Sequence, residues 1–117
     1  MNNYAFDVDE TLDVSAGPVS IASIDEVRRR GDIVGLNGNW AVVVQTVPLW
    51  HRLFSFIGPM EMSKEMFLKQ LKTYIRADDY VMVGNIKGIS GASDDEEAAG
   101  SAGWRFIKES DFAAGVR

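Results

Sequence analysis

The sequence predicts one three-layer α/β/α domain over residues 1–117, with a parallel sheet between two layers of helices. Short apolar runs typical of buried strands alternate with segments that carry helix-capping residues. This alternation favours parallel strands joined by right-handed crossovers. The chain has 117 residues, 46% of them hydrophobic, which is enough for one core. Neither an internal repeat nor a low-complexity linker divides it, so we expect a single domain.

Charge and cysteine content exclude several classes of function. The formal net charge is -5, whereas binding to a nucleic-acid backbone needs clustered positive charge. The chain has no cysteine, which excludes disulfides, thiolate catalysis and cysteine zinc sites and fits a reducing compartment. No basic region followed by an apolar core is visible near the N-terminus, so we expect no secretory signal and a cytoplasmic location.

The first expected strand is the apolar run Tyr4–Phe6, which acidic residues follow at once. In open α/β sheets the ligand crevice lies beyond the carboxyl ends of the strands, so Asp7 and Asp9 are expected at the mouth of a site. Carboxylates this close repel each other unless a cation lies between them. Together with Glu10 and Asp13, they therefore indicate a metal ion.

A calcium loop is an alternative interpretation of this acidic segment, because oxygen-bearing side chains stand on alternate positions from Asp7 to Asp13. The sixth position of such a loop needs glycine and is Leu12 here. The twelfth position needs glutamate and is Pro18. The sequence therefore excludes a calcium loop.

The first helix is expected after a glycine-proline turn. Ser20 or Ser23 can cap it, and Ser23 forms a capping box with Glu26. Arginines at 28–30 precede Gly31, which is the pattern of a cationic last turn followed by a C′ glycine. We interpret these arginines as a helix terminus rather than a binding patch.

The middle of the chain predicts a strand, a helix and a further strand. Ile33–Leu36 is expected to form the second strand, and Asn39 to cap a helix that ends before Pro48. Leu53–Ile57 is expected to form the third strand. The region 40–60 is apolar, but polar and charged residues, proline and glycine interrupt it too often for a membrane span.

The last part of the chain predicts two more strands. Ser63 is expected to open a helix with apolar residues at helical spacing, and Tyr80–Val83 to form the fourth strand. Ser93 forms a capping box with Glu96 at the start of the next helix. Trp104–Ile107 is expected to form the fifth strand, followed by a short tail.

Polar residues stand at the expected carboxyl edge of the sheet. They follow a strand or begin the next helix, and they are Asp7, Asp9, Asn37, Lys64, Asn85, Asp94 and Asp95. Acids can hold a metal, an amide can donate to a phosphate oxygen, and a lysine can offset phosphate charge. These are the parts that phosphoryl transfer requires.

The segment Phe6–Leu12, an apolar residue followed by D-x-D-x-T, resembles the first motif of the haloacid dehalogenase superfamily of phosphotransferases. The resemblance implies that Asp7 is the nucleophile and Asp9 the general acid and base, with Thr11 as a structural residue. It also implies the sheet order 5-4-1-2-3 for the five expected strands.

Further motifs follow in the family's order. Ile33–Asn37 is similar to the second motif, Lys64 to the third-motif lysine, and Val83–Asn85 to the fourth motif. The chain departs from the family twice, because Asn37 replaces a serine or threonine and Asn85 an aspartate. The resemblance implies a phosphate site formed by Asn37, Gly38 and Lys64. It also implies Mg²⁺ held by the carboxylate of Asp7, the carbonyl of Asp9, and either Asn85 or the pair Asp94 and Asp95.

These residues predict a Mg²⁺-dependent phosphohydrolase that acts through an aspartyl-phosphate. The alternative is a catalytically weak member of the family that binds phosphate or metal or serves in protein interactions. The two asparagine departures keep this alternative open, because an amide does not offset the charge of Mg²⁺ as a carboxylate does.

The chain has no room for the cap domain that many members of this family insert beside the first three motifs. An uncapped edge excludes water poorly. We therefore expect a bulky or macromolecular phosphorylated substrate, or a second subunit in a homodimer, to cover the site. The aromatic region around Trp40, Trp50 and Phe54 is expected to be either a contact surface or part of the core.

Overall fold

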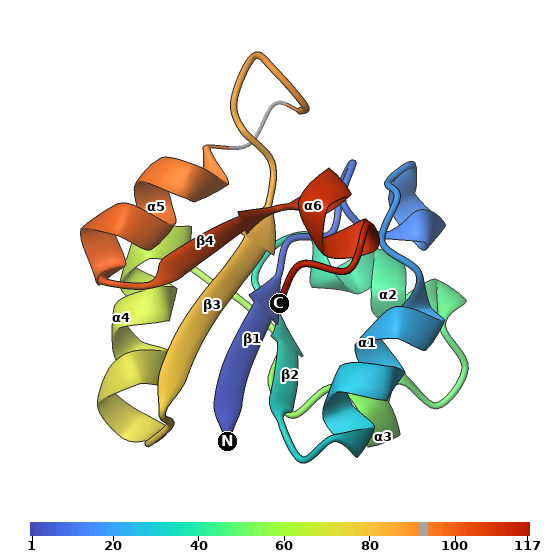
Figure 1. Cartoon of the computed structure of the whole chain (residues 1–117), viewed down its shortest axis with the longest axis horizontal. Coiled ribbons are helices and arrows are strands. Elements are labelled where there is room, and N and C mark those ends of the chain that lie inside the picture. The colour runs from blue at the N-terminus through green and yellow to red at the C-terminus, as the bar shows by residue number, and fades with distance from the viewer. Residues whose placement is uncertain (92–93) are drawn as a thin grey trace.

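The computed structural model describes residues 1–91 and 94–117, which form a four-stranded parallel sheet with helices on both faces (Figure 1). The strands are β1 (Asn2–Phe6), β2 (Ile33–Leu36), β3 (Asp79–Gly84) and β4 (Arg105–Lys108), in the order β2-β1-β3-β4. The helices are α1 (Ile21–Arg29), α2 (Trp40–Thr46), α3 (Trp50–Leu53), α4 (Lys64–Tyr74), α5 (Asp95–Ala102) and α6 (Glu109–Ala113), with a 3₁₀ turn, η1 (Asp13–Ser15). The three-layer parallel α/β fold expected from the sequence is therefore present.

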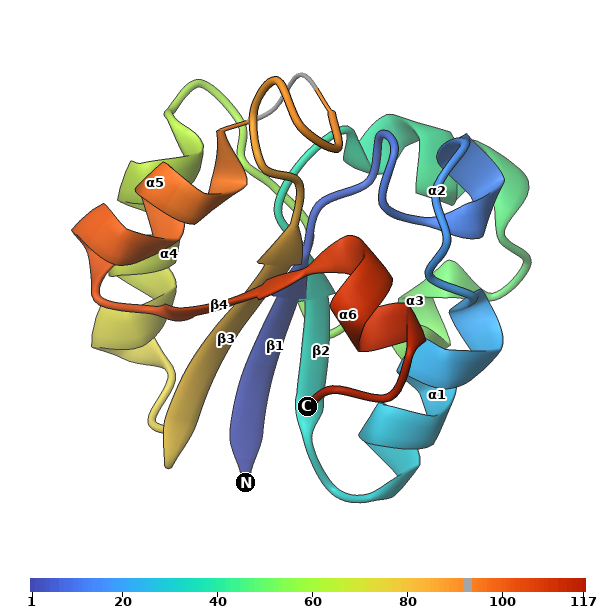
Figure 2. The same ribbon diagram turned by 45° about the horizontal axis from the view of Figure 1, so that its top comes forward.

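Alternating side chains of the central strand β1 bury themselves on opposite faces of the sheet. Tyr4 and Phe6 belong to the core that packs under α1, α2, α3 and α6, whereas Ala5 belongs to the core under α4 and α5. Figure 2 shows these two groups of helices on either side of the sheet. Phe112 of α6 is fully buried and packs edge-on against Phe6, with 5.1 Å between ring centroids.

The strands are in register at their carboxyl ends. Phe6 is paired with Leu36 of β2 and with Val83 of β3. The N–H of Asp7 donates to the carbonyl of Val83 (2.9 Å), which carries the pairing one residue beyond β1. This register places the residues that follow β1, β2 and β3 at one edge of the sheet.

The prediction of a strand at Leu53–Ile57 is wrong, because the sheet in the described part of the chain has four strands and this segment is not one of them. Leu53 closes the short helix α3, and the residues after it run beside β2 with two backbone hydrogen bonds. The N–H of Ser55 donates to Val34, but the N–H of Leu36 donates to Phe56 rather than to Ser55. This slip of one residue breaks the regular parallel pattern. The order of the other four expected strands agrees with 5-4-1-2.

Helices α1 and α4 begin with serine caps. The hydroxyl oxygen of Ser20 accepts a hydrogen bond from the N–H of Ser23 at the start of α1, so Ser20 rather than Ser23 is the cap. Ser63 accepts in the same way from the N–H of Met66 at the start of α4 (3.1 Å). The capping box expected at Ser93 lies outside the described residues.

The aromatic residues considered as a contact surface belong to the core. Phe54 is buried, and Trp40 and Trp50 are partly buried against the same cluster.

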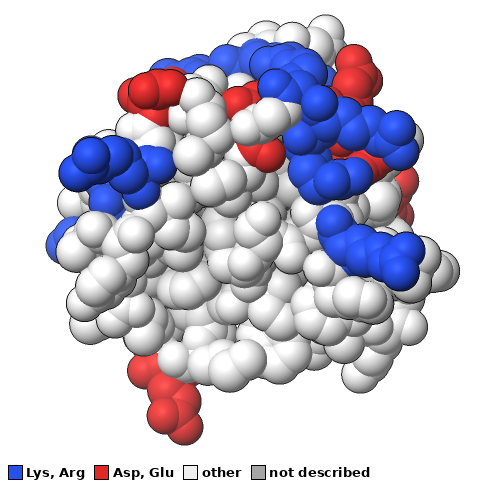
Figure 3. Space-filling model, turned by 90° about the horizontal axis from the view of Figure 1, so that it is seen from below, with Lys and Arg blue, Asp and Glu red and all other residues white. Residues whose placement is uncertain are grey.

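None of the helices in the described ranges has the length and apolar character needed to cross a membrane. Figure 3 shows the face at the amino ends of the strands, with an uncharged centre and both basic and acidic side chains along its rim.

Candidate active site

Lys64 links two carboxylates at the carboxyl edge of the sheet. It is the first residue of α4, and its Nζ lies 2.7 Å from Oδ1 of Asp7 and 2.9 Å from Oδ1 of Asp95. Asp7 directly follows β1, and Asp95 is the first residue of α5. Both acids are almost completely buried, with 1% and 0% of their surface exposed. A buried carboxylate pair of this kind depends on the ammonium group between its members.

The charges of this cluster perturb one another. Burial first and the carboxylate of Asp95 next raise the pKa of Asp7, the ammonium of Lys64 acts in the opposite direction, and the resulting pKa is about 7. Burial lowers the pKa of Lys64, but the two carboxylates outweigh burial and leave that pKa above its usual value. Lys64 is therefore a cation at neutral pH, and Asp7 changes its ionisation near neutrality.

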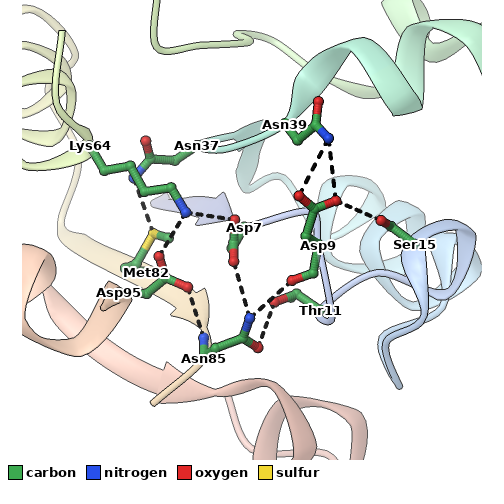
Figure 4. Close-up of polar contacts among 10 residues, drawn as sticks. All are labelled: Asp7, Asp9, Thr11, Ser15, Asn37, Asn39, Lys64, Met82, Asn85 and Asp95. Carbon is green, nitrogen blue, oxygen red and sulfur yellow. Dashed lines mark hydrogen bonds and ion pairs between the residues drawn. The ribbon is translucent and has the colours of Figure 1, made fainter. Parts of the chain in front are cut away.

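The side-chain amide of Asn85, the residue after β3, lies between the first two acidic positions. Its Nδ2 donates to the backbone carbonyl of Asp9 (2.9 Å) and to Oδ2 of Asp7 (3.3 Å), as Figure 4 shows. Its Oδ1 accepts from the hydroxyl of Thr11 (3.1 Å), and its backbone N–H donates to Oδ2 of Asp95 (2.9 Å). Asn85 is fully buried, and these contacts set the orientation of its amide in this structure.

The carboxylate of Asp9 lies apart from this cluster. It accepts from the hydroxyl of Ser15 (2.7 Å), and both of its oxygens lie 3.4 Å from Nδ2 of Asn39 (Figure 4). Sequence reasoning did not identify Ser15, and it interpreted Asn39 only as a helix cap. Asn39 does precede α2, but its side chain makes no capping hydrogen bond. A turn through Glu10, whose φ is 58°, brings Ser15 back to Asp9.

The expected phosphate-binding residues after β2 are already engaged with the protein. Asn37 is fully buried and its Nδ2 points toward Sδ of Met82 (3.5 Å), whereas its Oδ1 has no hydrogen-bond partner among residues 1–91 and 94–117. The N–H of Gly38 donates to the carbonyl of Gly58 (2.8 Å). Asn37 would have to turn its amide to donate to an oxygen in the site.

Three glycines allow the polar cluster to pack closely. A Cβ atom at Gly38 would lie 2.3 Å from Oδ1 of Asp7, and one at Gly84 would lie 2.4 Å from Oδ2 of Asp95. A Cβ atom at Gly91 would lie 2.5 Å from Nδ2 of Asn85. Each of these separations is shorter than a van der Waals contact, so the site requires glycine at all three positions.

An open cavity of about 300 Å³ adjoins the cluster between the first turns of α4 and α5. Its lining residues are Ser63, Lys64, Glu65, Asp94, Glu97 and Ala98. Asp94 is exposed here, and a hydrogen bond with Asp94 raises the pKa of Glu97. Asp94 therefore lies at the cavity, while Asp95 contacts Lys64 and Asn85.

The oxygen atoms that could bind Mg²⁺ in this site belong to a carboxylate, a backbone carbonyl and a side-chain amide. Among the residues that the structure describes, no group of three or more Asp, Glu, His or Cys side chains could hold a metal ion. However, Oδ2 of Asp7 and the carbonyl of Asp9 converge on the amide of Asn85. If that amide turned over, its Oδ1 would join them, and Mg²⁺ keeps several waters beside one or two protein carboxylates. The residues present therefore fit this ion once the amide has turned, and Asp94 and Asp95 stay predictions as further ligands.

Comparisons of the chain with protein-family models, with curated proteins and with solved structures found no match.

Proposed function

We propose that the protein is a Mg²⁺-dependent phosphohydrolase of the haloacid dehalogenase type that acts through an aspartyl-phosphate. The observation that supports the proposal most strongly is the position of Asp7, at the end of the central strand and 2.7 Å from the ammonium of Lys64. A nucleophilic carboxylate next to a cation that can offset phosphate charge is the pair that this reaction needs.

In the first step, a carboxylate oxygen of Asp7 attacks phosphorus and the bond from phosphorus to the ester oxygen breaks. Asp9 gives its proton to that leaving oxygen. In the second step, Asp9 takes a proton from water, the water oxygen attacks phosphorus, and the bond to Asp7 breaks. This releases inorganic phosphate and restores both carboxyl groups.

Lys64 would hold a phosphate oxygen throughout, and Asn37 would donate to another after its amide turns. Bound to Asp7, Asp9 and Asn85, Mg²⁺ would offset the charge of the phosphate oxygens. Asp9 would have to leave Ser15 and Asn39 to reach the ester oxygen, because these residues hold its carboxylate away from Asp7.

The central test is hydrolysis of p-nitrophenyl phosphate with Mg²⁺ and with EDTA. We expect turnover that needs Mg²⁺ and is abolished in Asp7→Asn, because an amide is not a nucleophile, and slowed in Asp9→Asn. Beryllofluoride, which mimics the aspartyl-phosphate, should bind the native protein. Equal turnover by the native protein and a folded Asp7→Asn variant would refute the covalent mechanism.

The alternative function is binding of phosphate without turnover. It is favoured by one observation: Asn37 and Asn85 are both fully buried and directed at protein atoms in the resting site. Calorimetry with inorganic phosphate distinguishes the two functions. Tight binding by the native protein, together with hydrolysis no faster than the uncatalysed rate, would establish the alternative.

The open edge of the site suggests the kind of substrate. Only η1 separates β1 from α1, and only α2 and α3 lie between β2 and the loop before α4, so the described chain has no inserted cap (Figure 1). We propose that a bulky phosphoester or a second subunit covers the site. Light scattering and a panel of small and large phosphoesters test this. A strict monomer that prefers small substrates would contradict it.

A further inference from the structure

The side-chain amide of Asn85 lies between oxygen atoms of Asp7 and Asp9, where a cation would otherwise be needed to offset their negative charge. Its Nδ2 donates to two oxygens of the segment that follows β1, Oδ2 of Asp7 at 3.3 Å and the carbonyl of Asp9 at 2.9 Å. These are two of the three oxygens that would hold Mg²⁺. The amide is fully buried, and a Cβ atom at Gly91 would lie 2.5 Å from its Nδ2, so little space remains around it.

Thr11 can form a hydrogen bond with either end of this amide. In the structure its hydroxyl donates to Oδ1 of Asn85 (3.1 Å). A hydroxyl can both donate and accept, so Thr11 can instead accept from Nδ2 once the amide has turned by half a revolution. The two ends of the amide have nearly the same size, so the turn needs no extra volume.

We infer that Asn85 is a two-position ligand whose amide replaces Mg²⁺ in the resting site and binds it in the loaded site. This inference rests on the proposed function. Without metal, Nδ2 bridges Asp7 and Asp9. With metal, Oδ1 faces the ion beside Oδ2 of Asp7 and the carbonyl of Asp9, and Nδ2 faces Thr11. Metal binding then breaks the two hydrogen bonds that Nδ2 donates and reverses the one with Thr11, so the site binds Mg²⁺ weakly and keeps its geometry without it.

The variant Asn85→Asp can bind a metal ion but cannot replace it as a hydrogen-bond donor, so it tests the two roles of the amide separately. A carboxylate has nearly the shape of the amide, but it cannot donate to Asp7 or to the carbonyl of Asp9, and it adds a negative charge that suits a hard cation. We expect Asn85→Asp to bind Mg²⁺ at least about tenfold more tightly than the native protein. Asn39→Asp is the matched control, because it adds the same charge on the far side of Asp9, and it should change the affinity less than about threefold.

Calorimetry with MgCl₂ and NMR of the Asn side-chain amides together test the inference. The Asn85 amide signals, identified by their loss in Asn85→Asp, should shift strongly when Mg²⁺ saturates the native protein. Unmoved Asn85 signals at saturation, or equal affinities of Asn85→Asp and the native protein, would overturn the inference. Triple-resonance assignment of the native protein also identifies the Asn85 amide signals, so a poorly folded variant does not prevent the test.

The two proposals fail separately. Shifted Asn85 signals without turnover in the phosphatase assay would refute the proposed function and leave the two-position ligand in place. Turnover that needs Asp7 and Mg²⁺, with unmoved Asn85 signals, would refute the two-position ligand alone.

Discussion

The ammonium of Lys64 lies 2.7 Å from the carboxylate of Asp7, although 57 residues separate them in the chain. The same ammonium contacts Asp95, so one cation serves two buried acids. Removing it would leave both carboxylates without a cation in a region from which water is largely excluded.

Lys64→Met should therefore abolish activity and lower the free energy of unfolding by roughly 3 kcal/mol or more at pH 7. Lys69→Met is the control, because Lys69 is on the same helix and forms an exposed ion pair with Glu65 (3.0 Å). That variant should cost less than about 1 kcal/mol. Urea unfolding of the two variants measures the difference, and equal losses would mean that the buried cluster does not depend on Lys64.

Asp7 should make stability depend on pH. Burial first and Asp95 next raise its pKa from 3.8 to about 7, so the folded protein binds this proton more tightly than the unfolded chain. The stabilising contribution is complete below about pH 4 and is lost as the pH rises to about 7. In Asp7→Asn this decline should be absent, which changes the slope of unfolding free energy against pH by up to about 1.4 kcal/mol per unit.

Asp25 gives the control for that experiment. Hydrogen bonds from Arg29 and Arg28 lower its pKa, so its contribution is present at neutral pH and is lost as the pH falls below about 4. Asp25→Asn should therefore leave the slope between pH 4 and 7 unchanged. A slope in Asp7→Asn that equals the native one would show that Asp7 titrates in the usual range.

Gly38→Ala should disrupt the site without a change of charge. The added methyl group would lie 2.3 Å from Oδ1 of Asp7, so the carboxylate must move away from Lys64. We expect a loss of about 1–3 kcal/mol in unfolding free energy and of most activity. Gly100→Ala, in the last turn of α5 with open space around the added atom, should instead stabilise the protein by about 0.5–1 kcal/mol. Thermal unfolding compares the two.

Asn3 offers a stabilising substitution outside the site. It is fully buried in β1, and neither polar atom of its side chain has a hydrogen-bond partner in the described ranges. Asn3→Val removes this buried amide and should raise the free energy of unfolding by about 1–2 kcal/mol. Asn2→Val, at a partly exposed position, should change it by about 0.5 kcal/mol or less. Denaturant unfolding would contradict the interpretation if Asn3→Val were the less stable of the two.

The sequence was sufficient to place four strands to within about two residues, because apolar runs mark buried strands and helix caps mark their connections. The failure at Leu53–Ile57 has a local cause. An apolar run does not reveal that the chain will slip by one residue against β2, so that Leu36 bonds to Phe56 while Ser55 bonds to Val34. Only the packed neighbour decides this register.

The sequence predicts which backbone positions meet at the site, but not the directions of their side chains. Parallel register brings Asp7, Asn85 and the start of α4 to one edge, and Lys64 and Asp95 meet there. Side-chain directions depend on turns that spacing does not encode. The carboxylate of Asp9 lies against Ser15 because the chain turns back after Glu10, whose φ is positive.

The central position of β1 affects the order in which the chain can fold. Its neighbour β2 follows within about thirty residues, but its other neighbour β3 pairs with it only through residues such as Val81, which pairs with Tyr4 77 positions away. During synthesis one backbone edge of β1 therefore stays open until β3 has left the ribosome. An open edge is a template for pairing with other chains. Until that point β1 of the nascent protein can pair with other chains, and the site lacks the residues that follow β3.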